Sequence, residues 1–241
     1  MATIGFIYPD HAAEDDYPLA ERLIGGNIRL PVAHIYGTDL HAVKELLDLG
    51  KPERLADGAR QLAAHQPDAV VWACTSGSFV YGWQGAREQA ERLSEAAGGL
   101  PASSTSFAFV HAAHALGTRR VAVVASYPDE VAKLFVDFLG AGGVEVTAMS
   151  SAGIATAAEV GNLSTEQVTD LVCAHDHPDA DAVLIPDTAM RTLALLEAIE
   201  QRLGKPVLTA NQVTVWEGLR LAGESITSDS LGALLRPGDT R

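Results

Sequence analysis

Short apolar segments alternate along the chain with longer segments that carry helical periodicity. The apolar segments predict strands at residues 3–8, 28–36, 69–73, 120–125, 144–149, 182–185 and 206–209. The periodic segments predict helices at residues 54–65, 80–97, 105–116, 130–139, 165–175, 190–203 and 213–221. Strands that are apolar throughout are typical of sheets buried on both faces, and alternation with helices is typical of parallel architecture. The pattern predicts an α/β fold with parallel sheets flanked by helices.

Three sequence blocks recur in the same order in the two halves of the chain. The block at 68–75 matches 181–188, the block at 7–10 matches 126–129, and the block at 100–106 matches 205–211. Each match is short, but three ordered matches at similar spacing indicate two homologous halves. We predict two pseudo-symmetric lobes, residues 1–117 and 118–222, with residues 223–241 completing the first lobe and the active site between the lobes.

Acidic residues outnumber basic ones, 31 against 17, and give a formal charge of −14. A field of this sign opposes binding to nucleic acid and to anionic membranes, so we expect neither partner. No apolar run approaches the roughly 20 residues of a membrane span, and no secretory signal pattern is present, so we expect a cytoplasmic protein. The sequence lacks both glycine-rich phosphate-binding motifs, and we expect no nucleotide cofactor.

Cys74 and Asp187 occupy equivalent places in the repeat, each directly after an apolar strand and before a threonine. Ligands of parallel sheets bind beyond the carboxyl ends of the strands, so the two side chains are expected to face one shared pocket. A thiol at a helix N-terminus is favoured as thiolate, and Cys74 is therefore predicted to be a nucleophile or a base. Asp187 is predicted to be the opposing acid or base. The alternatives are a small buried cysteine and a plain helix cap.

Hydroxyl groups follow both candidate catalytic residues. Thr75 and Ser76, with Thr188 in the second half, offer hydroxyls that, together with loop amides, suit a carboxylate or a developing enolate. Cys173, the second cysteine, lies within a helical pattern and has no counterpart in the first half, which favours a packed thiol. The His- and Asp-rich segment 175–179 has the composition of a solvated loop, and we expect no metal.

The chain resembles the aspartate/glutamate racemase superfamily, and within it the branch of maleate cis-trans isomerase and arylmalonate decarboxylase. The resemblance rests on these segments in this order: 4–9, 74–78, 126–130, 203–212 and Trp216. It implies two α/β lobes, no cofactor, and carbanion or enediolate chemistry on a small carboxylate between two acid/base positions that are usually cysteines.

The resemblance also implies roles for individual residues. Cys74 falls on the first cysteine position, which is the nucleophile in the isomerases, and Asp187 falls on the second. Thr75, Ser76 and Tyr127 match positions that bind or stabilise the substrate carboxylate in the decarboxylases. Thr188 and Asn211 complete the candidate substrate-binding residues.

The sequence departs from both activities of the branch. Ala12 and Ala157 stand where the isomerases carry asparagines, so two carboxylate-binding amides are missing. The decarboxylases have glycine at the first position and cysteine at the second, whereas this chain has Cys74 and Asp187.

We therefore predict a cofactor-independent isomerase that resembles maleate cis-trans isomerase and acts on a small carboxylate. The alternatives are an arylmalonate-decarboxylase-like lyase, an amino-acid racemase, and a catalytically silent carboxylate-binding homologue. The sequence leaves open whether the chain forms a homo-oligomer.

Overall fold

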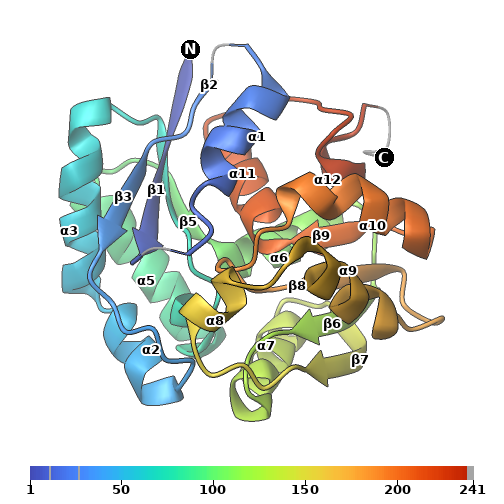
Figure 1. The fold of residues 1–241 in the computed structure, drawn as a ribbon. Coiled ribbons are helices and arrows are strands. Elements are labelled where there is room, and N and C mark those ends of the chain that lie inside the picture. The colour runs from blue at the N-terminus through green and yellow to red at the C-terminus, as the bar shows by residue number, and fades with distance from the viewer. Residues whose placement is uncertain (11, 27, 238–241) are drawn as a thin grey trace.

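The computed structural model describes residues 1–10, 12–26 and 28–237, and their strands form two parallel sheets (Figure 1). In the first sheet the order is β2 (Ile28–Arg29), β1 (Ala2–Pro9), β4 (Ala69–Trp72) and β5 (Ala102–Ser104), and β3 (Val32–Ile35) also pairs with β1. In the second sheet the order is β7 (Glu145–Ser151), β6 (Arg120–Ala125), β8 (Ala182–Ile185) and β9 (Val207–Thr209). The predicted class, parallel sheets flanked by helices, is confirmed.

The two sheets repeat one connection pattern. With β2 left aside, the strands of each sheet, numbered along the chain, lie in the order second, first, third, fourth. This order is β3-β1-β4-β5 in the first sheet and β7-β6-β8-β9 in the second. The repeated blocks of the sequence fall on equivalent strands: one pair at the ends of β1 and β6, one on β4 and β8, and one on β5 and β9. The internal repeat is therefore a repeat of structure.

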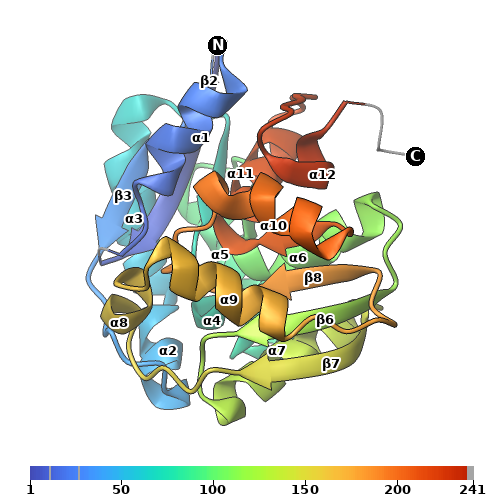
Figure 2. The same ribbon diagram turned by 45° about the vertical axis from the view of Figure 1, so that its right-hand side comes forward.

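Helices cover the sheets on both sides. Their bounds are α1 Asp16–Ile24, α2 Val43–Leu49, α3 Pro52–Leu62, α4 Ser76–Phe79, α5 Gly82–Ala96, α6 Thr105–Ala115, α7 Asp129–Ala141, α8 Ala157–Gly161, α9 Thr165–Ala174, α10 Leu196–Leu203, α11 Ala210–Leu221 and α12 Gly232–Leu235, with 3₁₀ turns η1 Ala63–His65 and η2 Leu193–Leu195. Figure 2 shows α9 and α10 in front of the second sheet, over a separate cluster of buried side chains that includes Val124, Val183 and Ile199.

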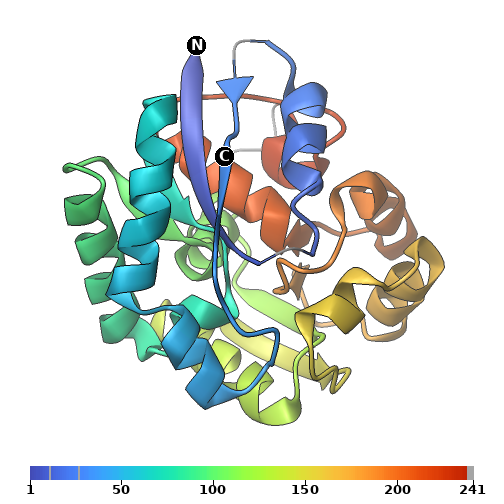
Figure 3. The same cartoon turned by 60° about the vertical axis from the view of Figure 1, so that its left-hand side comes forward.

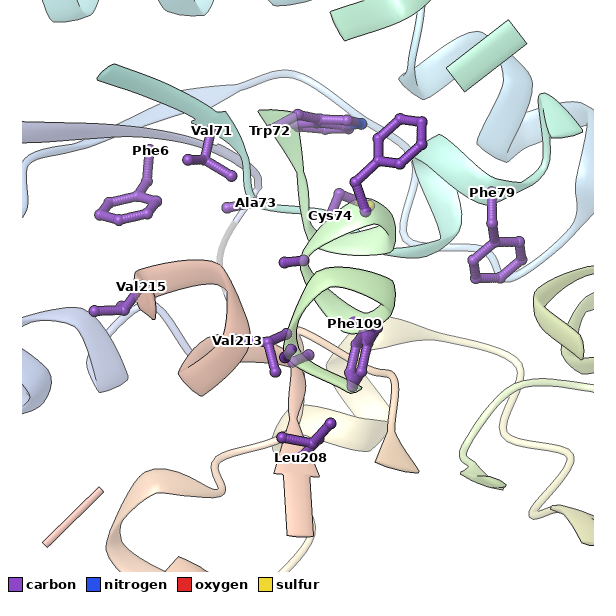
Figure 4. Packing of buried hydrophobic residues seen from close by; sticks show 14 of the residues in the cluster. Phe6, Val71, Trp72, Ala73, Cys74, Phe79, Phe109, Leu208, Val213 and Val215 are labelled. Atoms are coloured by element: carbon purple, nitrogen blue, oxygen red, sulfur yellow. The ribbon is translucent and has the colours of Figure 1, made fainter. Parts of the chain in front are cut away.

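The main core is continuous between the two sheets. Phe6 and Val71 of the first sheet and Leu208 of the second belong to one buried cluster, in which Phe109 of α6 and Val213 of α11 also pack (Figure 4). The two sheets are therefore held together by apolar packing as well as by the chain.

Helix α11 packs against the first sheet although it follows the last strand of the second. It contacts α6, β4 and β1, and Figure 3 shows it behind the blue N-terminal strand. In the predicted closing segment 223–241, α12 packs on α10, α11 and β9, and residues 238–241 lie outside the described residues. Helix α11, assigned to the second lobe, thus contacts the first sheet, and α12, assigned to the first lobe, contacts the second sheet. The lobe boundaries stay a prediction.

Several local predictions differ from the structure for identifiable reasons. The predicted strand 28–36 is divided into β2 and β3 around Pro31, which has no amide hydrogen for the ladder. The sequence does not predict strand β5, because it has only three residues, Ala-Ser-Ser, and no apolar run. It does not predict helices α1, α2, α4, α8 and α12 either. Ser164 caps α9 and Gln167 closes a capping box, as serine followed three residues later by glutamine favours.

A buried carboxylate ties α6 to α11. Glu217 is fully buried, and burial opposes its ionisation, but Oε1 accepts a hydrogen bond from His111 at 2.9 Å and Oε2 accepts one from Arg220 at 2.8 Å. These partners outweigh burial and lower the pKa of Glu217 to about 2. Because the folded pKa lies below the ordinary value of 4.5, ionised Glu217 stabilises the fold above about pH 4.5, and this contribution is lost as the pH falls towards 2.

Replacing Glu217 with glutamine is therefore expected to lower the free energy of unfolding by about 3 kcal/mol at pH 7. Urea unfolding of both proteins at pH 7 and at pH 2.5 measures the effect, and the difference between them should shrink at the lower pH. Glu91→Gln, on an exposed face of α5, is the control and should change stability by no more than about 0.5 kcal/mol. An equal difference at both pH values would contradict this account.

Candidate active site

A cavity lies beyond the carboxyl ends of β1, β4 and β8, between the two sheets. Its lining comes from both lobes: Tyr8, Pro9, Asp10, Ala12, Thr38, Asp39, Leu40, His41, Leu46, Leu49, Cys74, Ser76, Ala157, Asp187, Thr188 and Ala189. Among the predicted site residues, Cys74, Ser76, Asp187 and Thr188 meet at this cavity. Thr75, Tyr127 and Asn211 do not line it and are buried behind it.

Cys74 is a buried thiol at the end of β4. Its Sγ accepts a hydrogen bond from the Gly77 amide at 3.3 Å and lies 3.8 Å from the Ser76 hydroxyl. Residue 77 must be small, because a Cβ there would stand 2.9 Å from Trp72 and 3.1 Å from Sγ. Figure 4 shows Cys74 among the buried apolar side chains of the main core.

The expectation that Cys74 is a thiolate at rest is wrong. Burial, and to a smaller extent the negative charge of Asp187, raise the pKa of its thiol to about 12, against the lowering effect of the Gly77 and Ser76 hydrogen bonds. The helix that begins at Ser76 has only four residues, so its dipole is too small to offset desolvation. Cys74 therefore rests as a neutral thiol, which is a proton donor.

This charge state predicts a large difference between the two cysteines in thiol reactivity. Cys173 is only partly buried, and although burial also raises its pKa, its surroundings are far more open. At pH 8 we expect iodoacetamide to alkylate Cys173 at least about a hundredfold faster than Cys74. Peptide mass spectrometry over time measures both rates, and in guanidinium chloride the two should become equal. Faster alkylation of Cys74 in the native protein would show that its thiol is not held neutral.

Asp187 is a buried carboxylate, 3% exposed, at the end of β8. The Ser126 hydroxyl donates a hydrogen bond to Oδ2, and the Ala189 amide donates one to Oδ1 at 2.9 Å. The side chain does not cap a helix, because the next helical turn begins only at Leu193. One carboxylate oxygen thus stabilises the local turn, the other binds Ser126 directly after β6, and Asp187 lines the cavity.

Thr75 and Tyr127 lie directly behind the cavity wall. Thr75 is fully buried, and within the described part of the chain the Tyr127 side chain is the polar group that its otherwise unsatisfied hydroxyl approaches. The Tyr127 hydroxyl donates to the Pro186 carbonyl in the loop that carries Asp187. Burial, followed by the charge of Asp187, raises the pKa of Tyr127 well above its usual value. Tyr127 is therefore a neutral hydrogen-bonding group that fixes the Asp187 loop.

Asn211 does not reach the cavity. Its amide nitrogen donates to Asp16 at 3.0 Å and to the Thr188 carbonyl at 3.2 Å. We expected this residue to bind substrate, and the structure instead shows both of its amide hydrogens engaged within the protein. Asn211 fixes the backbone of the cavity loop at Thr188.

Three residues near the site were missed by sequence reasoning. Tyr8 donates from its hydroxyl to the Thr188 carbonyl at 2.7 Å, and the repeat could have revealed it because Tyr8 is the counterpart of Tyr127. Asp16 ends an acidic run of three residues, a composition typical of a solvated segment, but it is buried, and burial raises its pKa to about 6. His41 lies in a segment without periodicity, and no signal in the sequence could have placed it here.

Ala12 and Ala157 both line the cavity, Ala12 from the loop after β1 and Ala157 from the first turn of α8. Arg191 holds these two segments together, since its guanidinium contacts the carbonyl of Ala12 at 2.6 Å, the carbonyl of Gly161 at the end of α8, and both oxygens of Asp15. The positions that would carry carboxylate-binding amides therefore present methyl groups to the cavity.

The fold and this cavity define a class of two-lobed α/β proteins that place one candidate acid/base group from each lobe at a shared site. The chain belongs to the arylmalonate decarboxylase family, whose model matches residues 39–235. It is 32% identical over 188 residues to the arylmalonate decarboxylase of Bordetella bronchiseptica, covering 77% of this chain and 75% of that protein. It is 28% identical over 203 residues to the maleate isomerase of Geobacillus stearothermophilus, covering 81% and 80%.

A solved structure extends the similarity to the whole fold. The maleate isomerase Iso from Pseudomonas putida superposes with a TM-score of 0.89 over 98% of both chains at 22% identity. Within residues 1–10, 12–26 and 28–237, no helix is long and apolar enough to cross a membrane.

Proposed function

We propose that this protein is a cofactor-independent isomerase that acts on a small carboxylate, with Cys74 and Asp187 as its two proton-transfer groups. The observation that carries the proposal is the pairing itself: a buried thiol and a buried carboxylate reach one cavity from the ends of equivalent strands in the two sheets. In this proposal the neutral Cys74 thiol is the acid and the Asp187 carboxylate is the base of a two-sided proton transfer.

In this mechanism Asp187 removes the proton from the α-carbon of the substrate. The electron pair of the broken C–H bond moves into the carboxylate and gives an enediolate. The Cys74 thiol then donates its proton to the opposite face of the α-carbon, so the product is inverted, Cys74 is left as thiolate and Asp187 as carboxylic acid. Transfer of one proton from Asp187 to Cys74, directly or through water, restores the resting state.

The enediolate needs hydrogen-bond donors at the end of β4. The Ser76 hydroxyl lies at the cavity, and the buried Thr75 hydroxyl behind it has no partner other than the Tyr127 side chain within the described residues. Donors that are already oriented stabilise developing negative charge more than water does. We assign substrate-carboxylate binding to Thr75 and Ser76, with Thr188 on the facing loop.

The substrate is proposed to carry one anchored carboxylate and an apolar substituent. Leu40, Leu46 and Leu49 line one side of the cavity, and Ala12 and Ala157 offer no amides for a second carboxylate. An aryl or vinyl substituent would fit this lining and would also delocalise the carbanion. A diacid such as maleate would leave its second carboxylate without a donor at these two positions.

A second candidate function is decarboxylation of a substituted malonate. The neutral Cys74 thiol favours it, because protonation of the enediolate left after loss of carbon dioxide requires an acid but no base. The family supports it as well, since the relative at 32% identity is an arylmalonate decarboxylase. Nucleophilic addition of Cys74 to a double bond would require Asp187 to take the thiol proton first.

Proton NMR in D₂O with single-enantiomer 2-phenylpropanoate, phenylmalonate and maleate separates these functions. Inversion with deuterium at the α-carbon supports the isomerase, formation of phenylacetate supports the decarboxylase, and fumarate supports addition to the double bond. Thermal stabilisation by these acids without any product would favour the silent binding homologue and overturn the proposal.

A further inference from the structure

We propose that His41 is the imidazolium counter-ion of the Cys74 and Asp187 pair, an inference that rests on the proposed function for its catalytic meaning. His41 lies between β3 and α2, lines the cavity, and has a side chain only 5% exposed. Its Nε2 stands 3.9 Å from Oδ2 of Asp187. Among the described residues, it is the only basic side chain within 4 Å of that carboxylate.

The neighbours of the two ring nitrogens are the observations behind this proposal. Nδ1 lies 3.1 Å from the carbonyl oxygen of Ile154, and a carbonyl only accepts, so Nδ1 carries a hydrogen. In a neutral ring Nε2 would then be a bare lone pair facing a carboxylate oxygen. A proton on Nε2 removes this repulsion between two acceptors and gives an imidazolium paired with a carboxylate.

Backbone contacts between the lobes hold the segment that carries the ring. The His41 amide donates to the Ala155 carbonyl at 2.8 Å, and the neighbouring Leu40 forms a bridge with Thr156. The imidazole also meets the Tyr127 ring edge-on, with centroids 5.0 Å apart. His41 belongs to the first half of the chain but is held by the second, so its position depends on how the two lobes meet.

The other titratable residues at the cavity, Asp10 among them, do not supply a positive charge. Asp187 approaches from the loop after β8, Tyr127 from the loop after β6, the Cys74 thiol from the loop after β4, and Tyr8 from the end of β1. Asp39 also lines the cavity, and its carboxylate accepts a hydrogen bond from the Ala158 amide at 2.8 Å.

A buried cation has a specific use in this reaction. The Cys74 and Asp187 pair carries one negative charge before and after proton transfer, first on the carboxylate and then on the thiolate. An uncompensated buried charge is costly in free energy, and one fixed imidazolium balances the charge in both states. His41 keeps its own protons throughout, so the step remains balanced with the transfer of a single proton from substrate to Asp187 and another from Cys74 to product.

The direct test is nitrogen NMR of the His41 ring, with its signals assigned by their disappearance in His41→Asn. We expect a hydrogen on both ring nitrogens, and loss of the hydrogen on Nε2 in Asp187→Asn, which keeps the shape of residue 187 and removes its charge. A ring with a single hydrogen in the wild-type protein, or one that keeps both hydrogens in Asp187→Asn, would overturn the proposal whatever the activity.

Two further measurements need His41→Asn, whose amide can still donate to Ile154. In a Cys173→Ala background we expect Cys74 to be alkylated about tenfold more slowly than with His41 present, because its thiolate has lost a cation. On a substrate found in the NMR panel we expect kcat to fall about a hundredfold with little change in KM. The exposed His114→Asn is the control and should change neither. An unchanged alkylation rate would count against the counter-ion role.

The outcomes for His41 and for the proposed function are separable. A His41 imidazolium that depends on Asp187, in a protein that converts no acid of the panel, would support the ion pair and overturn the isomerase. Turnover in a protein whose His41 ring is neutral would support the isomerase and overturn the ion pair.

Discussion

Cys74→Ala is expected to lower turnover by about a thousandfold and to leave the fold intact. The thiol is the proton donor on one face of the substrate, and loss of a positioned acid costs between a hundredfold and ten-thousandfold. Alanine fits the buried site and removes only Sγ, which accepts a single amide hydrogen bond from Gly77. Steady-state kinetics, with circular dichroism to check folding, measure the effect.

Cys173→Ala is the matched control for this variant. Cys173 lies on α9 and is not part of the cavity lining, so its removal is expected to change turnover by less than about twofold. A folded Cys74→Ala protein that retains more than a tenth of wild-type activity would show that the thiol is not the acid.

Asp187→Asn is expected to abolish isomerisation by a similar factor while sparing any decarboxylation. The amide retains an oxygen for the Ala189 hydrogen bond but cannot take a proton from carbon. Since the charge of Asp187 raises the pKa of Cys74, the variant should also alkylate faster at Cys74. Chiral chromatography of the product and peptide mass spectrometry measure the two effects.

Asp170→Asn is the control for the carboxylate change. Asp170 lies on the exposed side of α9, where its oxygen stands 3.7 Å from Arg202, and its loss should leave both readouts within about twofold. If isomerisation survives in Asp187→Asn, another group must be the base. This result would refute the pairing of Cys74 and Asp187 on which the proposed function rests.

The sequence contained most of the fold because the strands are buried on both faces. Residues 120–125 and 182–185 are apolar almost without interruption and form β6 and β8 with those bounds. The predictions failed for elements that are fixed by tertiary contacts and not by local hydrophobic periodicity. Strand β5 is short and small, and its backbone is ordered by pairing with β4, which no local periodicity records. The packing of α11 against the first sheet is likewise fixed by the core that the two sheets share, and local periodicity does not record it.

The sequence also placed the two main site residues but misjudged their electrostatics. The repeat put Cys74 and Asp187 at equivalent strand ends, and both line the cavity. Burial and the charge of Asp187 both raise the pKa of the Cys74 thiol, and both depend on how the two lobes pack. The sequence does not show this packing, so the predicted thiolate was wrong. His41 could not be found because its relation to Asp187 exists only after residues 154–156 bind the segment before α2.

The most direct test of the central claim is where solvent deuterium appears early in the reaction of one enantiomer in D₂O. If Asp187 removes the proton on one face and Cys74 delivers another on the opposite face, the inverted product carries deuterium at the α-carbon while the recovered substrate remains protiated. Equal labelling of recovered substrate and product would mean that one group serves both faces, and would contradict the assignment of Cys74 and Asp187 as opposed acid and base.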